Sequence, residues 1–201
     1  PNFALTLGCE IHSRPYSHTR GLVVALKPTI YKCNIVVSDL NRDYYESVQL
    51  TVAQHPSETV ERMMARVLAY SINADEHLTF TKGLSSVDEP DIWLKSLDGQ
   101  IALWVDMGEP DAERIKKATR LAREVKVYSF NSKSDVWWSQ GKDKFAALDA
   151  SFFQFQWEEI KALAALVTRT MDMSITITGD SAYIAMESGE CEVSWVQLQA
   201  D

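Results

Sequence analysis

The sequence predicts a mixed α/β domain, with one β-sheet flanked by helices. Two observations support this fold class: strand-like and helix-like runs alternate along most of the chain, and the last part returns to strands. The 201 residues are 46% hydrophobic, which is enough for one well-packed domain. We expect this domain to span residues 24–201, after an N-terminal extension over residues 1–23 that shows no clear periodicity.

The first part of the predicted domain is a hairpin followed by a helix. Alternating apolar residues predict strands over Ile30–Val37 and Tyr44–Ala53, joined by a turn at Asp39–Asp43. Ser57 is the predicted N-cap of a helix that ends near Asn73. The apolar residues that recur with helical spacing are Val60, Met63, Met64, Val67 and Leu68. This helix is therefore expected to have one buried face and a solvated face opposite.

A second hairpin, after a short strand predicted at Leu78–Phe80, carries the most specific signal in the chain. Asp98-Gly99 separates two alternating runs, Asp91–Leu97 and Gln100–Asp106. This dipeptide predicts a two-residue type I′ turn, because both of its central residues need a positive φ. In such a turn Leu97 lies opposite Gln100, and the rest of the register follows by counting outward.

Two pairs of side chains are expected to face each other across this hairpin. Counting places Asp91 opposite Asp106 and Trp93 opposite Trp104, with all four on one face. Opposed carboxylates repel each other, so a divalent cation with oxygen ligands, Mg²⁺ or Mn²⁺, is a natural candidate to bind between them. The competing interpretation is that both acids point into solvent and that the tryptophans form a packed aromatic contact instead of a base-stacking platform.

The remaining elements complete a mixed sheet. Pro110 is the predicted first residue of a helix, and the strand Val125–Phe130 after it is expected to pair in parallel. Helices are predicted over about Lys133–Leu148 and Glu158–Thr168. The chain then ends in a β-rich C-terminal extension, whose predicted strands are Met173–Thr178, Tyr183–Met186 and Glu192–Leu198.

Composition narrows the function classes. The formal net charge of -8 disfavours nucleic-acid binding through an extended basic surface, although a bound metal ion can supply local positive charge. Three widely separated cysteines without a Cys-x-x-Cys pair are typical of a reducing cytoplasm. No apolar run approaches the roughly 20 residues needed to cross a bilayer. We therefore expect a cytoplasmic monomer that does not associate with a membrane.

The order of these elements, with acids at particular positions, resembles the PD-(D/E)xK nuclease superfamily. Pro90-Asp91 matches the Pro-Asp of the second core strand, and Asp106 falls where the third-strand acid is expected. The lysine of the signature would fall at Gly108, so the resemblance is broken there. It implies a nuclease-like core in which Asp91 and Asp106 bind Mg²⁺ or Mn²⁺ and the cation activates a water for phosphodiester hydrolysis.

The same resemblance implies an acid on the first core helix and a substitute for the missing lysine. Taking the apolar stripe as the buried face, a step of 100° per residue places Glu61 at its edge and Glu58 on the far side. Glu61 is thus the predicted third metal ligand, while Glu58 is expected to interact with the helix N-terminus. Lys117 or Lys116 would replace the lysine. His55 lies just before the helix, as either a structural residue or a general base.

At a finer level the chain is similar to the YaeQ family of bacterial proteins over roughly residues 24–198. The segments that carry the similarity are Ala25–Lys32, His55–Met64, Ala74–Leu78, Asp88–Pro90, Arg114–Ala118 and Trp137-Trp138. The resemblance implies a variant of the nuclease-like fold and leaves two function classes open. One is a metal-dependent phosphodiester hydrolase acting on nucleic acid. The other is a non-catalytic relative that binds a protein or nucleic-acid partner in a regulatory role.

Overall fold

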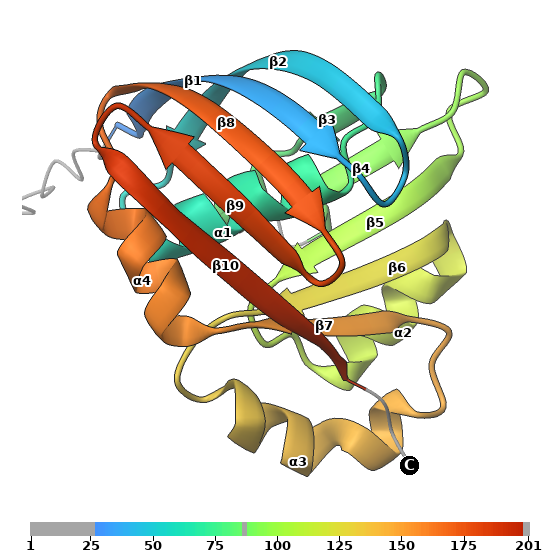
Figure 1. Cartoon of the computed structure of the whole chain (residues 1–201). Coiled ribbons are helices and arrows are strands. Elements are labelled where there is room, and N and C mark those ends of the chain that lie inside the picture. The colour runs from blue at the N-terminus through green and yellow to red at the C-terminus, as the bar shows by residue number, and fades with distance from the viewer. Residues whose placement is uncertain (1–26, 86–87, 199–201) are drawn as a thin grey trace, which may run out of the picture.

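The computed structural model describes residues 27–85 and 88–198, and in this part of the chain ten strands form one curled sheet (Figure 1). The predicted extension over residues 1–23 lies outside the described residues. The helices are α1 (Val60–Ile72), α2 (Ala112–Leu121), α3 (Ser134–Phe145) and α4 (Trp157–Ala165), with a 3₁₀ turn at Gly83–Ser85. The strands are β1 (Thr29–Asp39), β2 (Tyr44–Gln54), β3 (Leu78–Phe80), β4 (Ile92–Lys95), β5 (Ile101–Met107), β6 (Ala122–Ser129), β7 (Ser151–Phe155), β8 (Thr170–Thr178), β9 (Ser181–Met186) and β10 (Gly189–Leu198).

The sheet curls around the central helix. Its strand order is β2-β1-β8-β9-β10-β7-β6-β5-β4-β3, and neighbours are antiparallel except for the parallel pairs β1–β8, β5–β6 and β6–β7. Figure 1 shows α1 between two layers, with β1, β8 and β9 on one side and β5 and β6 on the other, while α2 and α3 lie outside the second layer. This mixed α/β arrangement confirms the predicted fold class at the level of one mixed sheet with flanking helices.

Helix α1 is buried on all sides. Every residue from Met63 to Ser71 is buried, including the charged Arg66. The prediction of a single buried face is therefore wrong for this helix, because both layers of the sheet cover it. Helix α2 covers only one layer and does keep a single buried stripe, in which Ile115 and Ala118 are fully buried while Leu121 is exposed.

Both predicted starts of helices shift along the chain. The N-cap of α1 is Thr59, not Ser57, and its Oγ1 accepts a hydrogen bond of 3.2 Å from the Arg62 N–H. The N-cap of α2 is Asp111, so Pro110 precedes the cap and is not the first helical residue. In both helices a side-chain oxygen satisfies the N–H three residues further on, which a proline cannot do.

The hairpin of β4 and β5 contains two departures from the predicted register that cancel. The Gly99 N–H bonds to the Ser96 carbonyl at 2.9 Å, and Gly99 alone of the Asp98-Gly99 pair has positive φ, at 81°. The loop thus has three residues and not two, so the predicted Leu97–Gln100 pairing is wrong. A register shift between Leu94 and Lys95 restores the predicted pairing, and Trp93 lies opposite Trp104 as expected.

The three C-terminal strands are not an extension of the sheet. They form its middle, because β8 pairs in parallel with β1 and β10 pairs with β7. Strand β7 was not predicted from sequence. The β1–β8 pairing joins residues more than a hundred positions apart, and the β10–β7 pairing joins Trp195 with Phe155, so no local pattern could have shown either.

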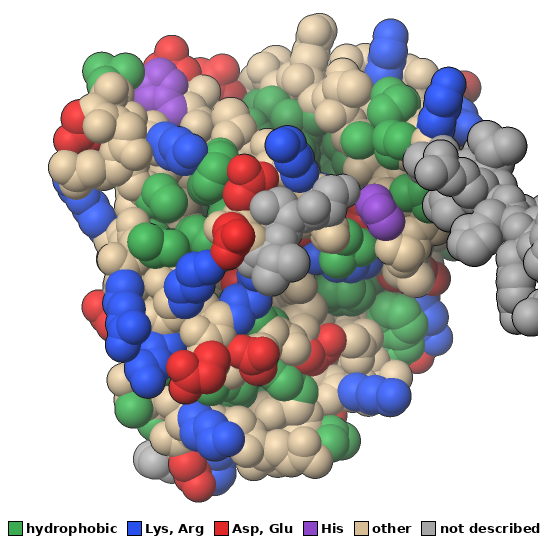
Figure 2. All heavy atoms as spheres, turned by 180° about the vertical axis from the view of Figure 1, so that it is seen from behind, with side chains coloured by type: hydrophobic (Ala, Val, Ile, Leu, Met, Phe, Trp, Pro, Cys, Tyr) green, Lys and Arg blue, Asp and Glu red, His purple; other side chains and the backbone are tan. Residues whose placement is uncertain are grey.

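The surface carries both signs of charge. On the face shown in Figure 2, acidic and basic side chains lie interspersed across much of the surface. In the described part of the chain no helix is both long and apolar enough to cross a membrane.

The fold predicts a large difference between two leucines. Leu68→Ala on the buried helix should lower the free energy of unfolding by about 2–5 kcal/mol, because it leaves a cavity in a core with little room to relax. Leu97 at the hairpin tip is 96% exposed, so Leu97→Ala should change it by less than about 0.5 kcal/mol. Urea denaturation of both variants checks this, and equal effects would contradict the enclosed position of α1.

Candidate functional site

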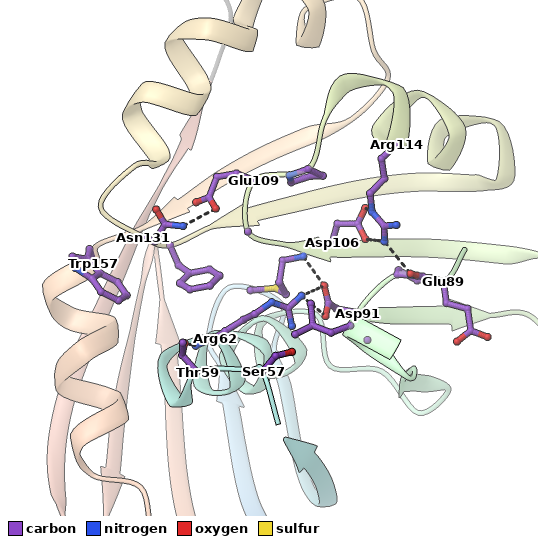
Figure 3. Close-up of a pocket in the computed structure, with 17 residues that line it drawn as sticks. Ser57, Thr59, Arg62, Glu89, Asp91, Asp106, Glu109, Arg114, Asn131 and Trp157 are labelled. Atoms are coloured by element: carbon purple, nitrogen blue, oxygen red, sulfur yellow. Dashed lines mark hydrogen bonds and ion pairs between the residues drawn. The ribbon is translucent and has the colours of Figure 1, made fainter. Parts of the chain in front are cut away.

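A cavity of about 600 Å³ opens where the parallel strands β5 and β6 end (Figure 3). Met107 lines it at the end of β5, Phe130 and Asn131 line it just after β6, and Trp157 lines it at the start of α4. The opposite wall includes Thr59, before α1. The carboxyl ends of parallel strands are the usual place for a binding site in α/β folds, because the loops there diverge and leave a crevice.

The two predicted carboxylates both line this cavity. The Asp91 N–H donates to the Val105 carbonyl at 3.0 Å, which continues the β4–β5 pairing by one residue. The Asp91 carboxylate accepts the buried N–H of Met107 at 2.9 Å. Asp91 is 4% exposed and Asp106 is 2% exposed. The alternative that both acids point into solvent at the open end of the hairpin is therefore wrong.

Arginine side chains, and not lysines, contact these acids. Arg62 of α1 donates from Nη2 to both carboxylate oxygens of Asp91, at 2.8 and 2.9 Å. Arg114 of α2 donates two hydrogen bonds to the Asp106 carboxylate, from Nε to Oδ2 at 2.9 Å and from Nη2 to Oδ1 at 2.7 Å. Such bidentate, charge-assisted pairs are the strongest and most directional of protein ion pairs.

Glu58, which precedes the N-cap of α1, and not Glu61 on the helix, is the acid that belongs to this cluster. Glu58 is 7% exposed and accepts from Arg62 Nη1 at 2.8 Å. It also accepts from Nε and Nη2 of Arg66, both at 2.8 Å. Glu61 is only partly buried and does not line the cavity, and its carboxylate makes no hydrogen bond or ion pair with any described residue. The prediction that Glu61 reaches inward is wrong, since it assumed one buried face on a helix that is covered all round.

The electrostatics of the cluster follow from burial and pairing. Burial raises the pKa of Asp106 above its ordinary value, and the Arg114 guanidinium opposes this shift without reversing it. The neighbouring Asp91 charge raises that pKa further. Burial acts to lower the pKa of Arg62, but Asp91 and Glu58 together raise it. Asp106 and Asp91 likewise raise the pKa of Arg114 against the effect of its burial, so both arginines stay charged beside their carboxylates.

The two candidate lysines lie on the surface. The Nζ of Lys117 is 2.5 Å from Asp88 Oδ1, and the Nζ of Lys116 is 3.7 Å from Glu113 Oε1. Neither residue lines the cavity. Arg62 follows Glu58 by four residues, and this spacing was a usable signal for the true basic partner. No comparable local signal pointed to Arg114.

The other accessory candidates do not line the cavity either. His55 Nδ1 lies 2.6 Å from Ser57 Oγ, in the turn before α1. Trp104 is buried in the second core, against α2 and α3, while Trp93 stacks beneath the Lys95 ammonium, 3.4 Å from the ring centre. The tryptophan pair therefore has a packing role, and neither ring is placed to contact a ligand in this cavity.

The donor set does not fit a divalent cation. The cluster contains three carboxylates (Glu58, Asp91, Asp106) and three guanidiniums (Arg62, Arg66, Arg114), so its formal charge is zero. Mg²⁺ and Mn²⁺ need carboxylate oxygens with free lone pairs and an excess of negative charge. In the described residues no three Asp, Glu, His or Cys side chains are grouped closely enough to hold a metal ion.

Comparisons with known proteins agree with one another. The family model described as YaeQ protein matches residues 24–195. A YaeQ protein of Escherichia coli (strain K12) is 41% identical over 180 residues, covering 88% of this chain and 98% of the relative. The crystal structure of the YaeQ protein from Xanthomonas axonopodis pv. citri has a TM-score of 0.83 at 33% identity, covering 87% of this chain and 99% of that one. The structure from Pseudomonas syringae has a TM-score of 0.82 at the same identity and covers 87% of this chain and 97% of that one.

The cluster predicts unequal effects for the two helix glutamates. Glu58→Gln removes the only carboxylate that contacts both Arg62 and Arg66 among the described residues, so it should lower the free energy of unfolding by about 3–5 kcal/mol. The matched control Glu61→Gln should change it by less than about 0.5 kcal/mol. Thermal and urea unfolding of both variants measure the difference. A larger effect for Glu61→Gln would contradict the assignment.

Proposed function

This chain belongs to the YaeQ family, and we propose that it is a non-catalytic protein with a nuclease-like core whose cavity at the ends of β5 and β6 binds a protein partner. The observation that carries this proposal is the pairing of both central acids with arginines. Arg62 and Arg114 occupy the carboxylate oxygens that a metal-dependent nuclease would use for its cation. The arginines neutralise the acids without providing the open coordination positions that hydrolysis requires.

The position of the missing lysine supports the same proposal. Gly108 has φ of +96°, a backbone conformation that side-chain-bearing residues rarely adopt, and its N–H bonds to the Tyr128 carbonyl at 2.8 Å. A lysine would be strained at this position. The backbone just after β5 therefore favours a glycine at position 108. This strand does not supply the lysine that the superfamily resemblance leads one to expect.

The lining of the cavity suits a protein partner better than a nucleic acid. Glu89 and Glu109 line it in addition to the two paired aspartates, so its acids outnumber its arginines. With a chain charge of -8, phosphate groups would be repelled. The wall also carries Trp157, Phe130 and Met107. Aromatic residues, methionine and arginine are the residues enriched at protein–protein interfaces.

One observation favours a second candidate, a Mg²⁺- or Mn²⁺-dependent phosphodiester hydrolase. Asp91 and Asp106 do line the same cavity at the carboxyl ends of parallel strands, with Asp91 directly after Pro90. For this function Arg62 and Arg114 would have to leave the carboxylates when cation and substrate bind, and a different basic group would have to stabilise the transition state. Cation binding distinguishes the two candidates.

Calorimetric titration of Mn²⁺ into four proteins makes that distinction. We expect no saturable binding to the natural chain at millimolar Mn²⁺, because the carboxylates are neutralised. Arg114→Gln should gain a Mn²⁺ site, since it leaves the Asp106 carboxylate without its guanidinium partner and the cluster with one net negative charge. The double variant Arg114→Gln/Asp106→Asn should lose that site again. Saturable binding to the natural chain that disappears in Asp106→Asn would instead support the hydrolase.

The partner-binding role predicts a specific loss from the cavity wall. Trp157→Ala should weaken binding of the partner by about 2 kcal/mol or more, because a half-buried tryptophan at a concave site is a typical hot spot. The experiment immobilises three proteins: the natural chain, Trp157→Ala and the exposed control Leu97→Ala. Quantitative mass spectrometry then compares which bacterial proteins each of them retains. A protein held by the natural chain and Leu97→Ala but lost with Trp157→Ala is the expected result. Identical sets from all three would contradict a protein partner at this cavity.

A further inference from the structure

We propose that an acidic peptide segment in extended conformation binds as an added β-strand between the two edges of the sheet, β2 and β3. The curl of the sheet brings these edges to one opening. A second cavity, of about 510 Å³, is lined by Thr51, Val52 and Ala53 from β2 and by Phe80 of β3 with the adjoining Thr81. Because β2 and β3 are the first and last strands of the order, this cavity lies at the seam where the sheet fails to close on itself.

The backbone groups of β3 at this seam point away from the sheet. The Leu78 carbonyl accepts from the Tyr70 hydroxyl at 3.0 Å, while the Thr81 N–H donates to the Asp91 carbonyl at 3.1 Å. Backbone groups alternate in direction along an antiparallel strand. Thr81 therefore faces toward β4, whereas Phe80 presents its N–H and C=O on the side without a neighbouring strand. On that same side the Leu78 N–H is already bonded to the Asp75 carbonyl at 3.1 Å, so Phe80 supplies the open backbone groups of β3.

The backbone groups of β2 at the seam are also directed outward. The Lys32 N–H bonds to the Arg169 carbonyl at 3.0 Å, on the β8 side of β1, so Lys32 does not bond to its register partner Thr51. The Ala53 carbonyl lies 3.5 Å from Arg66 Nη2, away from β1. Thr51 therefore presents its N–H and C=O at the open edge, and Ala53 presents its N–H there, while the Ala53 carbonyl accepts the hydrogen bond from Arg66. Edge groups of this kind are the template for strand addition by a peptide.

The charge of the seam selects an acidic segment. The ionisable side chains that line this cavity are Arg66, Lys82 and His55, and no aspartate or glutamate is among its described lining residues. The charge of Arg66 is balanced by Glu58 at 2.8 Å, so the exposed Lys82 supplies the positive charge that a ligand would meet. This sign is opposite to the net charge of the chain, -8. Lys82 is exposed, and Arg66 lies 5.3 Å above the ring of Phe80, which adds an apolar surface for alternate side chains. An acidic strand would thus meet backbone groups of β2 and β3 and the ammonium group of Lys82.

This inference does not rest on the proposed function, since it concerns a different cavity. Arg62 lines the cavity at the ends of β5 and β6, whereas Arg66 lines the seam. A peptide at the seam leaves the contacts of Trp157 and Asp106 unchanged. The experiments on the two cavities can therefore fail independently of each other.

The test is a nuclear magnetic resonance titration of the isotope-labelled full chain with two blocked peptides of sequence Glu-Val-Thr-Val-Glu and Lys-Val-Thr-Val-Lys. The acidic peptide should produce saturable shifts and slow the hydrogen exchange of the Thr51, Ala53 and Phe80 amides together. Lys82→Glu should weaken its binding at least about tenfold, since it places a like charge against the peptide. The control Lys144→Glu, an exposed lysine on α3, should leave binding unchanged.

Five results would overturn the inference, and four of them concern the peptides and variants directly. They are an absence of binding at millimolar acidic peptide, equal binding of the basic peptide, protection of the β2 amides without Phe80, and equal weakening by Lys82→Glu and Lys144→Glu. Shifts confined to the residues around Asp91 and Trp157 would likewise overturn it, and would assign the peptide to the other cavity. Joint protection of both edges by the acidic peptide alone would support it.

Discussion

The rest of the structure depends on the pairing of the buried Glu58 carboxylate with two arginines. It accepts hydrogen bonds from Arg62 and Arg66, which lie one helical turn apart on α1. Two arginine side chains can enter the interior of this protein only if an acid neutralises them there. Arg62 then extends to Asp91 in one cavity, while Arg66 lines the seam between β2 and β3. A single acid therefore positions an arginine at each of the two candidate binding surfaces.

Charge balance decides what the cavity at the ends of β5 and β6 can do. Figure 3 shows Arg62 and Arg114 directed at Asp91 and Asp106 from two helices. Two neighbouring carboxylates repel each other unless a positive charge lies close to them, and either a metal ion or guanidiniums can supply that charge. Here the arginines supply it, through hydrogen bonds of 2.7–2.9 Å to the carboxylate oxygens. The acids retain a structural purpose in this arrangement, because they hold α1 and α2 against the same edge of the sheet.

Local sequence patterns predicted most elements but not the environment of each one. The α1 pattern predicted the helix and its end near Asn73, yet its start lies two residues later than predicted. The choice of Glu61 over Glu58 failed, because a helical wheel assumes one solvated face. The hairpin of β4 and β5 shows the opposite case. An extra loop residue and a register shift cancel, so Trp93 meets Trp104 although the predicted turn type is wrong. The facing pairs survived because hydrophobic alternation, and not the turn, determines which residues are buried.

The sequence by itself determined the local elements, the family, and the presence of two acids on neighbouring strands, since these depend on periodicity and on short-range pairing. Only the tertiary structure decided that α1 is enclosed, that the C-terminal strands form the middle of the sheet, and that Arg62 and Arg114 pair with the acids. Asp91 and Arg62 are 29 residues apart, and β1 and β8 pair across more than a hundred residues. Contacts at such separations follow from how the layers pack, and no local pattern in the chain encodes them.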